Sequence, residues 1–249
     1  MSGKLCFYKK EAVMERGVDG TYENNRGWNL LNGIDCTKNE SAAIRWFKKS
    51  VKKGCTTAMV NLGNIYEGRQ DYKNAYYWYQ EAALAEDEAG MFNLANMYHW
   101  GWYVSRDYEK AYHYFKKLYD AGTVNGAVLM YLGLYAEYGY GREPNPEEAI
   151  AYYEEGIALH DAECATNLGV MYSDGVGIPK NYEKGFSYYM KGLKLGDSLA
   201  YADVGYCYET GQGVPKDLEK AREYYEKGAA LGNEESKKNL ENLKAKCQL

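Results

Sequence analysis

The sequence predicts an all-α array of about six helix-turn-helix repeats. A small residue recurs every 32 to 38 residues, with an Asn or Asp four residues before it and an aromatic residue four residues after it. This period, combined with helix-compatible spacing, is typical of helical repeat arrays. The small residues are Ala43, Ala75, Ala111, Ala149, Gly185 and Ala221. The preceding polar residues are Asn39, Asp71, Asp107, Asn145, Asn181 and Asp217. The aromatic residues are Phe47, Tyr79, Phe115, Tyr153, Tyr189 and Tyr225.

The last repeat explains each position in physical terms. An apolar residue at every fourth position up to Tyr208 predicts a first helix with one buried face. Residues 211–216 contain two glycines and a proline, which favour a turn. Asp217 then caps a second helix by accepting backbone N–H bonds, and Gly232 ends it. Such a pair cannot bury its apolar faces alone and must stack on its neighbours.

Two stretches carry a family resemblance. Residues 167–177 read NLGVMYSDGVG and residues 213–221 read GVPKDLEKA. Both resemble Sel1-like repeats, which are relatives of tetratricopeptide repeats, and the resemblance covers about residues 25–232. It implies a right-handed α-solenoid of stacked antiparallel helix pairs. We therefore expect one solenoid over 1–249, with an N-terminal cap segment (1–24), the repeats (25–232) and a C-terminal capping helix (233–249).

Composition restricts the partners. The chain has 249 residues, a formal net charge of −5 and no basic run, which argues against a nucleic-acid partner. No stretch approaches the roughly 18 apolar residues of a membrane helix, so no membrane partner is expected. The N-terminus has no long apolar segment of the secretory kind. If Met1 is the native start, we expect a cytoplasmic protein, and we expect a monomer rather than an oligomer.

The residues that could carry chemistry do not form a recognisable site. The six cysteines do not follow the repeat period, and we interpret them as buried reduced thiols. The three histidines are not paired at ligand spacing, so neither a metal nor a cofactor is expected. The resemblance raises a hydrolase of the β-lactamase or penicillin-binding type as an alternative. Its Ser-x-x-Lys signature occurs only at 50–53, without companion motifs, so we do not expect an enzyme.

In tetratricopeptide-like arrays the first helices line the concave face, and the resemblance implies that ligand contacts come from residues beside the packing stripe. Three columns of residues have that helical phase. The expected protein-binding residues are Asn29, Asn32, Asn61, Asn64, Glu67, Asn93, Asn96, His99, Trp100, Tyr131, Asn167, Asp203 and Tyr206. Asparagine amides both donate and accept, so a ladder of them suits an extended peptide backbone. The alternative is that these asparagines bond neighbouring helices within the array.

A loop near His99, Trp100, Trp102 and Tyr103 adds exposed-looking aromatic residues, which are favoured anchors at interfaces. The favoured hypothesis is a non-catalytic scaffold that binds a protein or peptide segment along the concave surface. The alternatives are the hydrolase described above and a self-assembling structural module.

Overall fold

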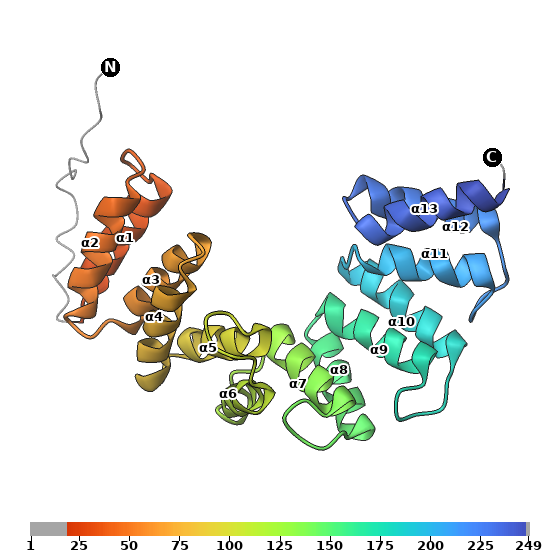
Figure 1. The fold of residues 1–249 in the computed structure, drawn as a ribbon, viewed down its shortest axis with the longest axis horizontal. Coiled ribbons are helices and arrows are strands. Elements are labelled where there is room, and N and C mark those ends of the chain that lie inside the picture. The colour runs from red at the N-terminus through yellow and green to blue at the C-terminus, as the bar shows by residue number, and fades with distance from the viewer. Residues whose placement is uncertain (1–18, 248–249) are drawn as a thin grey trace. The chain divides into compact units, whose positions relative to one another are not determined.

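The computed structural model of the chain describes residues 19–247 and shows helices α1 to α13 over that range, with no strand (Figure 1). The all-α prediction of stacked helix pairs is confirmed. None of these helices has the length and apolar character needed to cross a bilayer.

Each pair consists of a first and a second helix. The first helices are α1 (Thr21–Asn32), α3 (Thr56–Gly68), α5 (Glu88–Trp100), α7 (Gly126–Tyr138), α9 (Ala162–Asp174) and α11 (Ala200–Thr210). The second helices are α2 (Glu40–Val51), α4 (Tyr72–Leu84), α6 (Tyr108–Asp120), α8 (Pro146–Ala158), α10 (Tyr182–Leu195) and α12 (Leu218–Ala230). A last helix, α13 (Glu234–Cys247), packs on α11 and α12, as expected for a C-terminal cap. The expected N-terminal cap lies largely outside the described residues, and α1 already begins at Thr21.

The chain divides into two compact units, residues 1–118 and 119–249. Unit 1 contains α1 to α5 and most of α6, and unit 2 begins in the last turn of α6 and contains α7 to α13. The expectation of one continuous solenoid stays a prediction.

The six predicted caps open the second helices as expected. Where the bond is described, the Asn or Asp side chain accepts the backbone N–H three residues later, for example Asn39 from Ala42 at 2.8 Å and Asp217 from Lys220 at 3.0 Å. Such a cap supplies an acceptor that the first helical turn otherwise lacks. The first helices have caps that the columns did not predict, including Asp87, Asn125 and Asp161. Gly232 ends its helix with a left-handed φ of 87°, as expected, and His160 adopts a left-handed φ of 63° at the equivalent position after α8.

The aromatic column forms the core of each pair. Tyr79, Tyr153 and Tyr225 are at most 1% exposed, and each ring lies against a glycine of the preceding first helix. A Cβ at Gly63 would lie 2.3 Å from Cε1 of Tyr79, and one at Gly133 would lie 2.4 Å from Cε1 of Tyr153. Glycine is therefore required because the ring occupies the space of a side chain. The close approach lets the two helices of a pair bury one large residue completely.

We expect Gly63→Ala to lower the free energy of unfolding by at least about 1 kcal/mol, because the added methyl overlaps the buried ring of Tyr79. Gly68 is the matched control: it ends α3, and a Cβ there would meet nothing within 4 Å. Gly68→Ala should be neutral or slightly stabilising. Urea denaturation followed by circular dichroism measures both. Equal stability of the two variants would contradict this account of the glycine column.

Candidate functional site

Asparagine side chains connect successive first helices in unit 1. The Asn61 amide on α3 donates to Asn24 Oδ1 on α1 at 2.9 Å, and the Asn93 amide on α5 donates to Asn64 Oδ1 on α3 at 3.4 Å. Asn61 is buried, whereas Asn64 is exposed. Asn61 therefore bonds a neighbouring helix, which is the alternative considered from the sequence. Asn64 combines an intramolecular bond with an exposed amide group that can reach a ligand.

One position near the end of the first helices, occupied by Glu67, Glu137 and Glu209, pairs with the aromatic core. The Tyr79 hydroxyl donates to Glu67 Oε2 at 2.5 Å and also lies 2.8 Å from Asn64 Oδ1. Unit 2 repeats the pair twice, with Tyr153 donating to Glu137 at 2.8 Å and Tyr225 donating to Glu209 at 2.9 Å. Burial, together with these carboxylates, raises the phenol pKa values, so the hydroxyls stay protonated donors. Glu67, predicted as a ligand contact, thus has a structural role within its own repeat.

The sequence contains a signal for this pairing that the column analysis did not use. Four repeats carry a tyrosine in the aromatic column of the second helix. In three of them the first-helix residue that faces the tyrosine hydroxyl is a glutamate. In the fourth, Ser173 lies there, and its hydrogen bond acts on the pKa of Tyr189. The repeats with Phe47 and Phe115 lack a hydroxyl to satisfy. A buried hydroxyl without an acceptor lowers the stability of the fold. This explains why an acceptor occurs in the repeats with tyrosine and not in those with phenylalanine.

The first repeat has a different register from the predicted columns. Gly27, not Leu31, lies against the aromatic residue Phe47, with a Cβ position 2.7 Å from its ring. The positions equivalent to Asn61 and Asn64 are therefore Asn25 and Trp28, one helical turn before Asn29 and Asn32. The Asn29 carbonyl accepts the N–H of the helix-ending Gly33, and the Asn32 amide donates to the Trp28 carbonyl at 2.9 Å. Both predicted residues thus lie at the end of α1 and not on the equivalent face.

His99 was expected to be exposed, and this was wrong. It is 6% exposed and packs edge-on against Trp100, with ring centroids 4.6 Å apart, and against Tyr108. Burial lowers the pKa of His99, and the nearby Arg106 lowers it further. Trp100, in contrast, is 49% exposed, as predicted. Asn96 is half-buried, and its Oδ1 is buried without a hydrogen-bond partner among the described residues.

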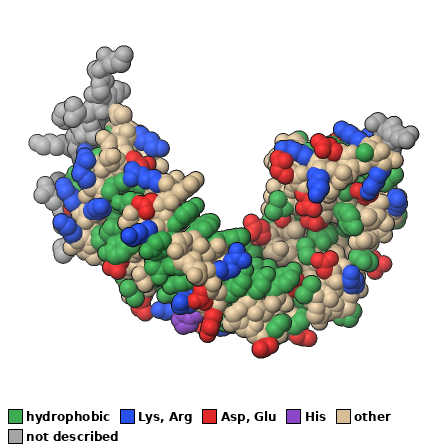
Figure 2. Space-filling model, viewed as in Figure 1, with side chains coloured by type: hydrophobic (Ala, Val, Ile, Leu, Met, Phe, Trp, Pro, Cys, Tyr) green, Lys and Arg blue, Asp and Glu red, His purple; other side chains and the backbone are tan. Residues whose placement is uncertain are grey.

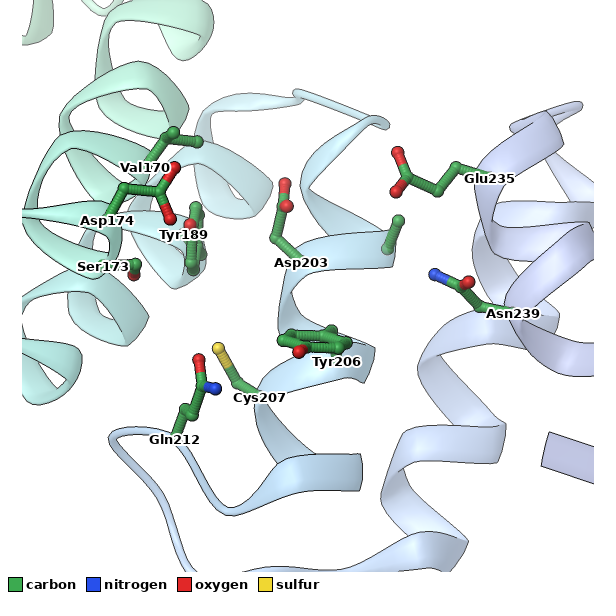
Figure 3. Close-up of a pocket in the computed structure, with 11 residues that line it drawn as sticks. Val170, Ser173, Asp174, Tyr189, Asp203, Tyr206, Cys207, Gln212, Glu235 and Asn239 are labelled. Atoms are coloured by element: carbon green, nitrogen blue, oxygen red, sulfur yellow. The ribbon is translucent and has the colours of Figure 1, made fainter. Parts of the chain in front are cut away.

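In unit 2 the structure brings two of the predicted residues together in a pocket. Asp203 and Tyr206, both on α11, line a cavity of about 250 Å³. Figure 3 shows this pocket between α9, α11 and α13, with the carboxylates of Asp174, Asp203 and Glu235 projecting toward it from these three helices. The remaining lining residues are Val170, Ser173, Tyr189, Ala202, Cys207, Gln212 and Asn239. The predicted residues Tyr131 and Asn167 are half-buried on α7 and α9 and do not line it.

The pocket is strongly acidic. Burial, together with the nearby charges of Glu235, Asp197 and Asp174, raises the pKa of Asp203 to about 7. Within residues 19–247, neither Asp203 nor Asp174 nor Glu235 has an ion-pair partner. Burial also raises the pKa of the adjacent Cys207 thiol to about 12, so this thiol is protonated and a poor nucleophile at neutral pH. The arrangement therefore suits electrostatic binding of a cationic group.

The serine and the cysteines that could carry chemistry do not form a catalytic arrangement among the described residues. The Ser50 hydroxyl of the Ser-x-x-Lys segment is fully buried and donates to the Gly20 carbonyl at 2.7 Å. Cys36, Cys55, Cys164 and Cys207 are free thiols. Over the described range, no group of three or more His, Cys, Asp or Glu residues is arranged to hold a metal ion.

The fold and the site define a helical-repeat protein of the α-solenoid class. The Sel1 repeat family model matches residues 23–55, 56–87, 89–123, 127–161, 162–197 and 198–233, and the chain belongs to this family. Sel1 repeats typically mediate interactions between proteins.

Known structures have the same fold. A protective antigen of uropathogenic Escherichia coli, c5321, is 28% identical with a TM-score of 0.71, and the match covers 90% of this chain and 48% of that chain. A Sel1 repeat protein from Oxalobacter formigenes is 24% identical with a TM-score of 0.74, and the match covers 85% of both chains. A curated relative is the ERAD-associated E3 ubiquitin-protein ligase component HRD3 of Candida glabrata, which is 33% identical over 81 residues. That match covers 32% of this chain and only 9% of the relative.

Proposed function

We propose that the chain is a non-catalytic interaction module and that its unit 2 pocket binds a basic side chain of a protein segment. The observation that carries this proposal is the set of three carboxylates around one open cavity, none with an ion-pair partner in the described chain. A lysine or arginine side chain has the charge and the slender shape to enter a cavity of about 250 Å³. The exposed ring of Tyr206 at the rim offers apolar contact to the methylenes of that side chain.

Amide groups in both units suit a peptide segment better than an isolated side chain. Gln212 and Asn239 add amide groups to the pocket wall, and amides can bond the backbone of an extended peptide. In unit 1 the exposed Asn64 supplies a similar group. Membership of the Sel1 repeat family supports a role in protein interactions, as does the relative HRD3, an E3 ubiquitin-protein ligase component. A cytoplasmic location and a monomeric state stay predictions.

A randomised peptide library tests the proposal. Wild-type protein should select peptides of about ten residues that carry arginine or lysine at a fixed position. Asp203→Asn should reduce affinity for a selected peptide about tenfold or more, because the central carboxylate is lost. Glu226→Gln on the exposed face of α12 removes the same charge outside the pocket and should change affinity less than about twofold. Equal losses in both variants would show a general charge effect and contradict the pocket assignment.

A further inference from the structure

One backbone position in unit 1 is occupied by an unexpected residue. Two residues after the glycine that ends a first helix, the chain adopts a left-handed φ, and Gly141, Gly177 and Gly213 occupy this position in the later repeats. In the third repeat the residue is Tyr103, with a φ of 65°. This conformation is disfavoured for a residue with a Cβ and a bulky ring. The side chain gains little from packing, because Tyr103 is 55% exposed.

Tyr103 belongs to a cluster of half-buried and exposed rings that we call the aromatic surface. Its members are Tyr72, Tyr76, Tyr77, Trp100, Trp102 and Tyr103. Tyr72 stacks on Trp102 with ring centroids 5.5 Å apart, and Tyr76 contacts Tyr103 at 5.6 Å. Tyr77 and Trp100 are each 49% exposed. Figure 2 shows hydrophobic side chains gathered over the part of unit 1 that contains α4. Three neighbouring exposed rings, those of Tyr77, Trp100 and Tyr103, are typical of a binding surface.

The aromatic surface borders a second cavity, of about 470 Å³. The cavity is lined by Lys73, Asn74, Tyr76, Tyr77, Gln80 and Tyr103. Its only charged lining residue is Lys73, which forms no ion pair within the described chain, and no carboxylate lines it. The lining also offers donors, because the described part of the chain gives the Gln80 amide and the Tyr77 hydroxyl no hydrogen-bond partner. The cavity therefore combines flat apolar rings with donors and one positive charge.

We propose that the aromatic surface binds an extended proline-containing segment of a partner protein that carries an acidic residue. Proline rings pack on flat exposed aromatic side chains, and a polyproline II segment presents carbonyl groups while its prolines offer no N–H. The donors of Gln80 and Tyr77 match those carbonyls, and Lys73 matches the acidic residue. The strained conformation of Tyr103 brings its ring to the edge of this cavity. This inference goes beyond the acidic pocket of unit 2, which attracts the opposite charge, and it does not depend on that pocket.

The test uses the full chain and a synthetic proline-rich peptide flanked by glutamates, followed by tryptophan fluorescence. Tyr103→Gly should weaken binding about tenfold or more, because the ring at the cavity edge is lost. Its thermal midpoint should be equal to or above that of the wild type, because glycine suits the left-handed backbone. Asp35→Gly is the matched control, since Asp35 occupies the equivalent position in the first repeat with a φ of 55°. It should leave peptide affinity unchanged.

Charge specificity provides the second arm. Lys73→Glu should weaken the glutamate-flanked peptide and strengthen the same peptide flanked by lysines. Equal affinity of wild type and Tyr103→Gly, or no detectable binding of the peptide at about 1 mM, would overturn the proposal. Binding of a neutral oligosaccharide in place of the peptide would also overturn it.

Discussion

Replacing Tyr153 by alanine is expected to lower the free energy of unfolding by about 4 kcal/mol, the largest effect of any single substitution considered for this chain. The side chain is fully buried between α7 and α8, and its ring occupies the space that a side chain at position 133 would need. Loss of the ring opens a cavity that the rigid helix pair cannot close. Loss of the hydroxyl also removes a hydrogen bond from the buried carboxylate of Glu137. Urea denaturation followed by circular dichroism measures the change.

Two further variants separate these contributions. Tyr153→Phe keeps the ring and removes only the hydroxyl. We expect it to lower the free energy of unfolding by about 1–2 kcal/mol. Burial raises the pKa of Glu137, and the Tyr153 bond opposes that rise. The cost of Tyr153→Phe should therefore diminish at acidic pH, where Glu137 is protonated. Tyr182→Ala, at a ring that is 37% exposed, should cost less than about 1 kcal/mol. A similarly small loss for Tyr153→Ala would contradict the proposed role of the aromatic column.

Local interactions explain why most of the fold could be predicted from the sequence. A cap such as Asn181 bonds a backbone group three residues away, so its effect is contained in a short stretch of sequence. The repeat period similarly follows from packing within each helix pair, where Tyr189 and Tyr225 lie against glycines of the preceding helix. The first repeat was misaligned because the loop of the second repeat is shorter. From Gly27 to Ala43 there are sixteen positions, as from Gly169 to Gly185, whereas only twelve separate Gly63 from Ala75.

The site was harder to predict, because its properties depend on residues far apart in the sequence. Asp203 and Tyr206 could be placed on a common face by helical phase, but Glu235 completes their pocket from α13. No repeat column includes Glu235, since α13 follows the last repeat. The burial of His99 was missed for a similar reason: it depends on Tyr108 from the following helix. Helical phase gives the direction of a side chain but not what covers it.

The acidic pocket leads to the second large prediction. Asp203→Asn should raise the free energy of unfolding by about 2 kcal/mol at pH 8. The pKa of Asp203 is raised to about 7 from 3.8, so the folded state retains a proton that the unfolded state releases between these values. The stability that this proton supplies is present at low pH and is lost as the pH rises through about 7. A pKa difference of this size corresponds to at most about 4 kcal/mol of folding stability. Because the pocket is open to solvent, we expect about half of that value.

The pH dependence distinguishes this cause from a general packing effect. Near pH 4 the carboxyl of Asp203 is protonated in the folded chain, and the advantage of Asp203→Asn should almost disappear. Urea denaturation at pH 4, 6 and 8, with Glu226→Gln as the exposed control, measures the profile. A variant that is more stable at pH 8 and binds basic peptides less well would show that the chain sacrifices stability to keep this charge. If stability instead falls at every pH, the carboxylate has a structural role, and the pocket assignment loses its electrostatic support.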